Sequence, residues 1–76
     1  MSVRRTSTMA SETVRVNGKD VPLTITDAAG LISSLGYDLQ KVAVELNGTI
    51  CPRASLGATV LKDGDSLEIV SFVGGG

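Results

Sequence analysis

The chain has 76 residues, of which seven are basic and eight acidic, and its formal net charge at pH 7 is −1. This length fits one small domain, and the balanced charge argues against nucleic-acid binding, which needs a clustered basic surface. The chain has one cysteine and no histidine, which excludes an internal disulfide, a structural zinc or iron–sulfur site and histidine-based catalysis. We therefore expect no catalytic residue, bound metal or bound cofactor, and we interpret the chain as something other than an autonomous enzyme.

Residues 1–12 carry Arg4-Arg5 among serines and threonines. A secretory or twin-arginine signal would need an apolar stretch after the arginines, and none follows them. No apolar run in the chain approaches the ~20 residues of a membrane helix. We predict a disordered lead-in over 1–12, with Met9 as an alternative start, and a cytoplasmic protein that binds neither membranes nor nucleic acid.

A β-hairpin is predicted at the start of the ordered chain. Apolar and polar residues alternate over 13–16, Asn17-Gly18 is the strongest short-range hairpin signal, and the alternation resumes over 21–25. Pro22 fits this second strand only at a sheet edge or where a ladder bond is missing.

The apolar period then changes to that of a helix. One stripe with helical spacing is formed by Ala28, Leu31, Ile32 and Leu35. Thr26 or Asp27 is predicted to cap the start of this helix, and Gly36 to close it in the left-handed conformation. Gly30 inside it costs about 1 kcal/mol relative to alanine, so the helix depends on packing against a sheet.

The second half of the chain is predicted to return to strands. Residues 42–46 alternate, Asn47-Gly48 turns them into a short strand over 49–51, and Pro52 ends it. Residues 53–62 are expected to be irregular, with one helical turn around 56–61, before a tight turn at 63–65 and a last strand.

This order of elements folds most simply as one mixed sheet of four to five strands wrapped over one helix. It predicts an α+β fold, the β-grasp or ubiquitin-like architecture, with the domain at 13–73 and a flexible glycine tail at 74–76.

The chain ends in Gly74, Gly75 and Gly76. Glycine loses the most conformational entropy on ordering and packs nothing, so a stable domain has no need of such a strip. It makes sense if the terminal carboxylate is the working group and is threaded into the active site of another protein, roughly 10 Å away from the domain. A frayed terminus is the alternative interpretation.

The last strand carries apolar residues on both of its faces. If Leu67 and Ile69 meet the helix, then Val70 and Phe72 lie on the uncovered face beside the tail. We interpret these two residues, together with Val73, as a surface that docks a partner. The alternative is that neighbouring strand side chains partly cover them.

Several motifs resemble the ThiS-like sulfur carriers of thiamine biosynthesis. They are VELNG at 44–48, the Pro52-Arg53 pair, and DGDSLEIVSFVGGG at 63–76, within a resemblance that covers roughly 13–76. The resemblance implies that a partner adenylating enzyme uses ATP and magnesium to convert the Gly76 carboxylate to an acyl-adenylate. It further implies that sulfur from a persulfide donor then gives a thiocarboxylate, which is delivered to thiazole synthase. Gly74 and Gly75 would let the backbone pass close to the walls of a partner.

Other functions remain open at this point. The same chemistry serves molybdopterin synthesis, in which a small-subunit-like carrier delivers the sulfur. A ubiquitin-like modifier attached to lysines and a plain interaction module with an inert tail belong to different classes of protein.

Cysteine, arginine, aspartate and glutamate side chains elsewhere in the chain have chemistry of their own. Cys51 is interpreted as a small core hydrophobe rather than a sulfur relay, because no basic residue or helix terminus is evidently placed to activate its thiol. Arg53 fits a partner contact or a solvated surface position equally well. The carboxylates of Asp63, Asp65 and Glu68 are better explained by turn chemistry than by a metal site.

Overall fold

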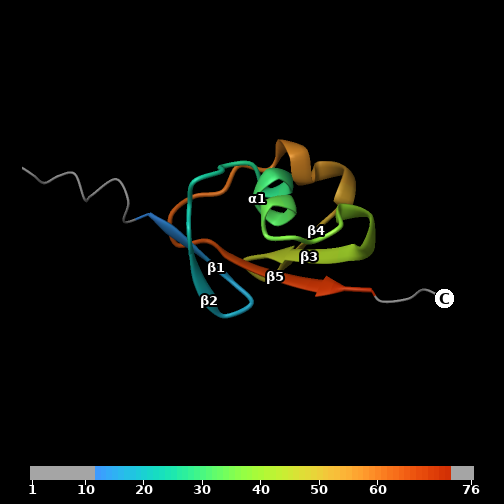
Figure 1. The fold of residues 1–76 in the computed structure, drawn as a ribbon, viewed down its shortest axis with the longest axis horizontal. Coiled ribbons are helices and arrows are strands. Elements are labelled where there is room, and N and C mark those ends of the chain that lie inside the picture. The colour runs from blue at the N-terminus through green and yellow to red at the C-terminus, as the bar shows by residue number, and fades with distance from the viewer. Residues whose placement is uncertain (1–11, 73–76) are drawn as a thin grey trace, which may run out of the picture.

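The computed structural model describes residues 12–72 and shows a five-stranded mixed sheet with one main helix (Figure 1). The strands are β1 (Thr13–Val16), β2 (Lys19–Pro22), β3 (Val42–Leu46), β4 (Thr49–Cys51) and β5 (Ser66–Ser71), and helix α1 spans Ala28–Ser34. Their order across the sheet is β2-β1-β5-β3-β4, with β5 parallel to β1 and antiparallel to β3. This is the predicted β-grasp arrangement. Two parts of the chain lie outside the described residues: 1–11, which are the predicted lead-in without Glu12, and 73–76, which are Val73 and the three terminal glycines.

Both predicted Asn-Gly turns are confirmed. Asn17 and Gly18 have φ angles of 50° and 87°, and Asn47 and Gly48 have 53° and 85°. Two successive positive φ angles define the type I′ turn, which matches the twist of the strands that it joins. The turns accordingly connect the antiparallel pairs β1–β2 and β3–β4.

The second strand begins before the alternation over 21–25, at Lys19, and ends at Pro22, three residues before that alternation ends. Leu23 still donates its N–H to the Glu12 carbonyl at 2.9 Å, but Thr24 donates to the Pro22 carbonyl at 3.1 Å, and the chain turns out of the sheet. Pro22 has no N–H to continue the ladder, and it ends an edge strand, as expected. Leu23 and Ile25 are half-buried against the core although they lie outside the strand.

The ends of helix α1 follow the sequence prediction. Asp27 is the N-cap, and its Oδ2 accepts the Gly30 N–H at 2.7 Å. Gly36, at φ 97°, follows the C-cap residue Leu35. Leu35 departs from the predicted apolar stripe: it is the C-cap residue of the helix and is 40% exposed.

The helical turn expected around 56–61 begins three residues earlier. A 3-10 helix spans Arg53–Ala58, where Ser55 donates its N–H to the Pro52 carbonyl at 2.8 Å. Residues 59–61 are held to the start of α1 instead: Ala28 donates to the Thr59 carbonyl at 2.9 Å, and Leu61 donates to the Thr26 carbonyl at 2.7 Å. A second, shorter 3-10 helix, Leu39–Lys41, precedes β3.

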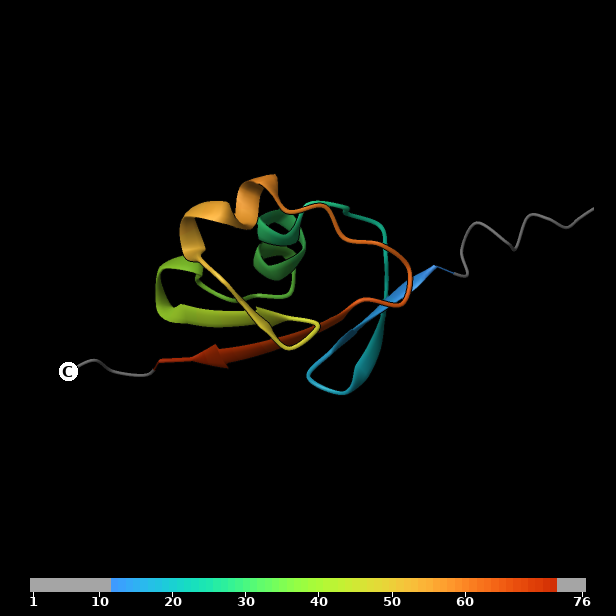
Figure 2. The same cartoon turned by 180° about the vertical axis from the view of Figure 1, so that it is seen from behind.

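The core lies between the sheet and this helical layer. It consists of Val14, Val16, Ala28, Leu31, Ile32, Val42, Val44, Leu56, Leu61, Leu67 and Ile69. In both views the helices lie on one side of the sheet, so the opposite face has no helical cover (Figures 1 and 2). Among the described helices, none is both long and apolar enough to span a membrane.

Candidate functional site: the end of β5 and the uncovered sheet face

Strand β5 is the central strand, and it leads to the C-terminal end of the described chain (Figure 1). Leu67 and Ile69 point into the core, where they are 1% and 6% exposed. The strand pairs with the whole length of β3, from Leu46↔Leu67 to Val42↔Ser71. The base of the predicted tail is therefore anchored by both burial and backbone pairing.

The two Asn-Gly turns also hold β5 through their asparagine side chains. Asn17 Oδ1 accepts the Ile69 N–H at 2.7 Å, and its Nδ2 donates to the Ile69 carbonyl at 3.1 Å. Asn47 Oδ1 accepts the Ser66 N–H at 2.9 Å, while its own N–H donates to the Ser66 carbonyl at 2.8 Å. The sequence explains both asparagines by turn preference alone, and it does not show that their side chains also bind the backbone of β5.

The uncovered face presents exposed apolar side chains from β4, from β5 and from the residue that follows β5. Val70 and Phe72, the predicted docking residues, are 59% and 52% exposed. Ile50 of β4, which sequence reasoning did not single out, is 74% exposed. A groove of about 160 Å³ on this face is lined by Ala43, Val44, Glu45, Ile50, Glu68 and Val70. Val73 and the three glycines that complete the predicted site lie outside the described residues.

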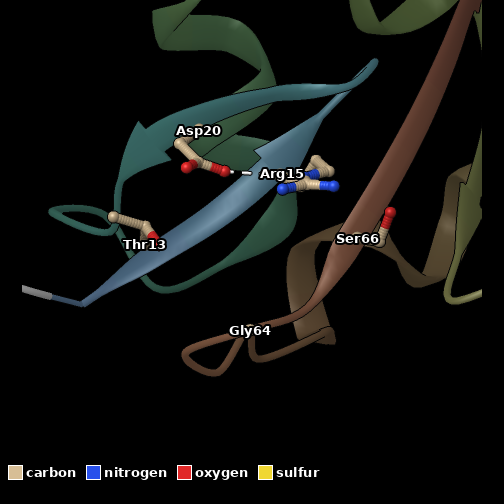
Figure 3. A pocket seen from close by; sticks show the side chains of 5 residues that line it. All are labelled: Thr13, Arg15, Asp20, Gly64 and Ser66. Atoms are coloured by element: carbon tan, nitrogen blue, oxygen red, sulfur yellow. Dashed lines mark ion pairs between the residues drawn. The ribbon is translucent and has the colours of Figure 1, made fainter.

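A second, polar hollow lies at the opposite end of β5. It has a volume of about 380 Å³ and is lined by Thr13, Arg15, Asp20, Gly64 and Ser66 (Figure 3). Arg15 Nε lies 3.5 Å from Asp20 Oδ1, and both side chains are more than half exposed. An exposed ion pair of this kind contributes little to stability. The hollow holds no pair of groups suited to acid–base catalysis.

The side chains of Cys51, Asp63 and Asp65 make contacts within the fold. Cys51 is half-buried against the core, with its Sγ 3.5 Å from Thr59 Oγ1. Asp63 Oδ1 accepts the Thr13 N–H at 2.8 Å, and Asp65 Oδ2 accepts the Lys62 N–H at 2.8 Å. The Asp65 carboxylate thus acts within its turn, as predicted, whereas the Asp63 carboxylate binds the first residue of β1, which is 50 residues away in the sequence.

The other two candidates are exposed. Arg53 is exposed at the start of its 3-10 helix, and Glu68 is exposed on β5. Over residues 12–72, no three His, Cys, Asp or Glu side chains are grouped closely enough to hold a metal ion.

Two curated proteins named thiazole synthase contain a segment similar to this chain. The protein from Paramagnetospirillum magneticum is 52% identical over 46 residues, which are 60% of this chain and 14% of that protein. The one from Magnetococcus marinus is 45% identical over 51 residues, which are 67% of this chain and 16% of that protein. The chain thus matches only about one seventh of the length of these relatives.

A solved structure and a family model cover far more of the chain. The crystal structure of the thiamine biosynthesis protein ThiS from Geobacter metallireducens superposes with a TM-score of 0.67 at 37% identity, covering 84% of this chain and 99% of that one. The model of the ThiS family matches residues 11–76, which include the β-grasp domain and the C-terminal glycines. On this match, the chain belongs to the ThiS family.

Proposed function

We propose that this chain is a sulfur carrier of thiamine biosynthesis, and that it works through its C-terminal glycine. The observation that carries the proposal is the ThiS-family match, which runs through Gly76 at the end of the sequence. The anchored strand β5 and the exposed apolar face beside its end support the same function, because a tail that enters another active site needs an adjacent docking contact.

In the proposed reaction a partner enzyme supplies the catalytic groups, and the carrier supplies the reacting carboxylate. That carboxylate is ionised at neutral pH, since its reference pKa is about 3.3–3.7, and an anion resists attack by nucleophiles. A carboxylate oxygen of Gly76 would attack the α-phosphate of ATP and release pyrophosphate, with magnesium held by the adenylating enzyme. The outer sulfur of a persulfide donor would then displace AMP, and reduction of the remaining S–S bond by a thiol would leave a thiocarboxylate.

We propose thiazole synthase as the acceptor of this sulfur. The support is that two proteins of that name contain a segment similar to this chain. No corresponding observation favours a molybdopterin synthase or a lysine-attached modifier. Because the loading step consumes ATP, we place it in the cytoplasm.

The exposed residues Val70 and Phe72, together with Ile50, are proposed to dock both partners in turn. One tail must enter two active sites in succession, so the same neighbouring surface is available to each enzyme. The carrier then contributes binding and positioning, which bring the reacting atom close to the catalytic groups of the partner.

The test is to incubate the chain with ATP, magnesium, the adenylating enzyme of its own organism and a persulfide donor, and to measure the mass of the C-terminal peptide. We expect an exchange of sulfur for oxygen confined to Gly76, and none when ATP is omitted. The peptide must be isolated, because oxidation of Met1, Met9 or Cys51 adds nearly the same mass.

The matched variant is Gly75→Val, which adds a branched side chain next to the reacting residue. We expect it to abolish sulfur loading while the melting temperature stays at the wild-type value, because position 75 follows Ile69, the last core residue of the described range 12–72, by six residues. A Gly75→Val chain that loads normally, or a wild-type chain that an active partner leaves unmodified, would contradict the proposed function.

A further inference from the structure

Glu45 and Glu68 face each other on the uncovered side of the sheet. They are paired residues in the β3–β5 register, and both are exposed. Their strand neighbours Val44, Leu67 and Ile69 point into the core, so the alternation along each strand directs both glutamates to the opposite face.

Two like charges directly opposite each other in an antiparallel pair destabilise a sheet. Within residues 12–72 the one ion pair joins Arg15 to Asp20, so no cation of the described chain pairs with either glutamate. Arg15 lies opposite Ser66, on the same face, but is engaged with Asp20. The described domain therefore keeps an uncompensated acidic pair at a position where one neutral residue would remove the repulsion.

The residues around Glu45 and Glu68 indicate which kind of side chain would neutralise their negative charges. Both glutamates line the 160 Å³ groove together with apolar residues, among them Ile50 and Val70. An arginine fits such a site well, because its planar guanidinium binds carboxylates through paired hydrogen bonds while its aliphatic stem packs on apolar surface. Arginine is also enriched in the centres of protein interfaces.

We propose that Glu45 and Glu68 form the recognition site for an arginine side chain presented by thiazole synthase. This inference rests on the proposed function, which names that enzyme as the acceptor. The pair adjoins Val70, so an enzyme docked on the apolar face would cover the carboxylates at the same time. Docking would then add the missing positive charge, and electrostatic attraction would speed the encounter.

The test compares wild type with the double variant Glu45→Gln/Glu68→Gln, using thiazole synthase of the same organism and calorimetric measurement of Kd. We expect the double variant to melt about 2–4 °C higher, because the repulsion between the strands is gone. We expect its Kd to rise about tenfold at low salt. Raising the salt concentration should weaken wild-type binding and leave binding of the double variant nearly unchanged.

Glu12→Gln is the matched control, since it makes the same chemical change at an exposed position before β1. It should leave Kd at the wild-type value. The proposal is overturned if the double variant binds as tightly as wild type, or if Glu12→Gln weakens binding equally. Sulfur loading of Gly76 is measured on the same samples. A wrong assignment of the acidic pair as a binding site is thereby distinguished from a wrong assignment of the carrier function. A loaded wild-type chain that does not bind thiazole synthase would overturn the proposed acceptor and this inference with it.

Discussion

Gly30 lies in the first turn of α1, where a side chain would disturb the helix cap. A Cβ at this position would lie 2.8 Å from Ile25 Cγ2 and 2.9 Å from each carboxylate oxygen of Asp27. The Asp27 carboxylate is already held at the Gly30 N–H, so it has little freedom to move away. Helix propensity alone favours alanine here by about 1 kcal/mol, and the contacts favour glycine.

We expect Gly30→Ala to lower the free energy of unfolding by about 1 kcal/mol, as measured by urea denaturation. The loss of the cap and the displacement of Ile25 should together outweigh the gain in helix propensity. Gly57→Ala is the control, because a Cβ at Gly57 meets nothing within 4 Å. An alanine variant at position 30 that is more stable than wild type would show that the cap region adapts at no cost.

The sequence narrowed the N-cap to Thr26 or Asp27, because capping depends on residues within one helical turn, and the structure assigns it to Asp27. The sequence was not sufficient to explain Gly30, because the contact with Ile25 depends on how the chain leaves β2. The bonds from Asn17 to Ile69 were missed for the same reason, since 52 residues separate the partners.

Among the elements, both hairpins were predictable because an Asn-Gly turn and its flanking strands are local features. The sequence prediction misplaced the 3-10 helix at Arg53–Ala58, since the position of this helix depends on burying Leu56 and on the bonds that tie residues 59–61 to α1.

For the candidate site, strand alternation was enough to place Val70 and Phe72 on the uncovered face. It could not show that Ile50 joins them, because that requires the pairing of β3 with β4.

At the end of β5, Phe72→Ser tests the docking surface. Phe72 is 52% exposed, so we expect the free energy of unfolding to change by no more than about 0.5 kcal/mol. Loss of the apolar contact should raise the KM of the adenylating enzyme for the carrier about fivefold to tenfold while kcat stays unchanged. Steady-state loading kinetics measure both constants.

Val60→Ser is the matched control for this variant. Val60 is 64% exposed and forms an isolated bridge with Asp27, at the start of α1 rather than on the uncovered face. We expect its loading kinetics to equal those of wild type. Equal effects of the two substitutions would indicate general surface damage and would contradict a docking role for Phe72.

At the scale of the whole molecule, one core joins the strands, the helix and the 3-10 segment. Leu56 comes from the 3-10 helix, is 2% exposed, and belongs to the same buried cluster as Ile32 and Leu67. A domain of this size buries a small core and has a modest free energy of unfolding, so each large core residue matters for the whole. The 3-10 segment should therefore unfold together with the sheet rather than by itself.

We expect Leu56→Ala to lower the free energy of unfolding by about 2–4 kcal/mol, through lost burial and the cavity left behind. Far-ultraviolet circular dichroism and the fluorescence of Tyr37, the one tyrosine of the chain, report on different parts of the domain. Both urea transitions should shift together to lower concentration, because the molecule unfolds as one cooperative unit. Val60→Ala, a substitution at an exposed position in the adjoining segment, should leave both urea transitions at their wild-type concentrations. If Leu56→Ala left the Tyr37 transition in place while the dichroism changed, the 3-10 segment would be a separate unit, and the single shared core would be wrong.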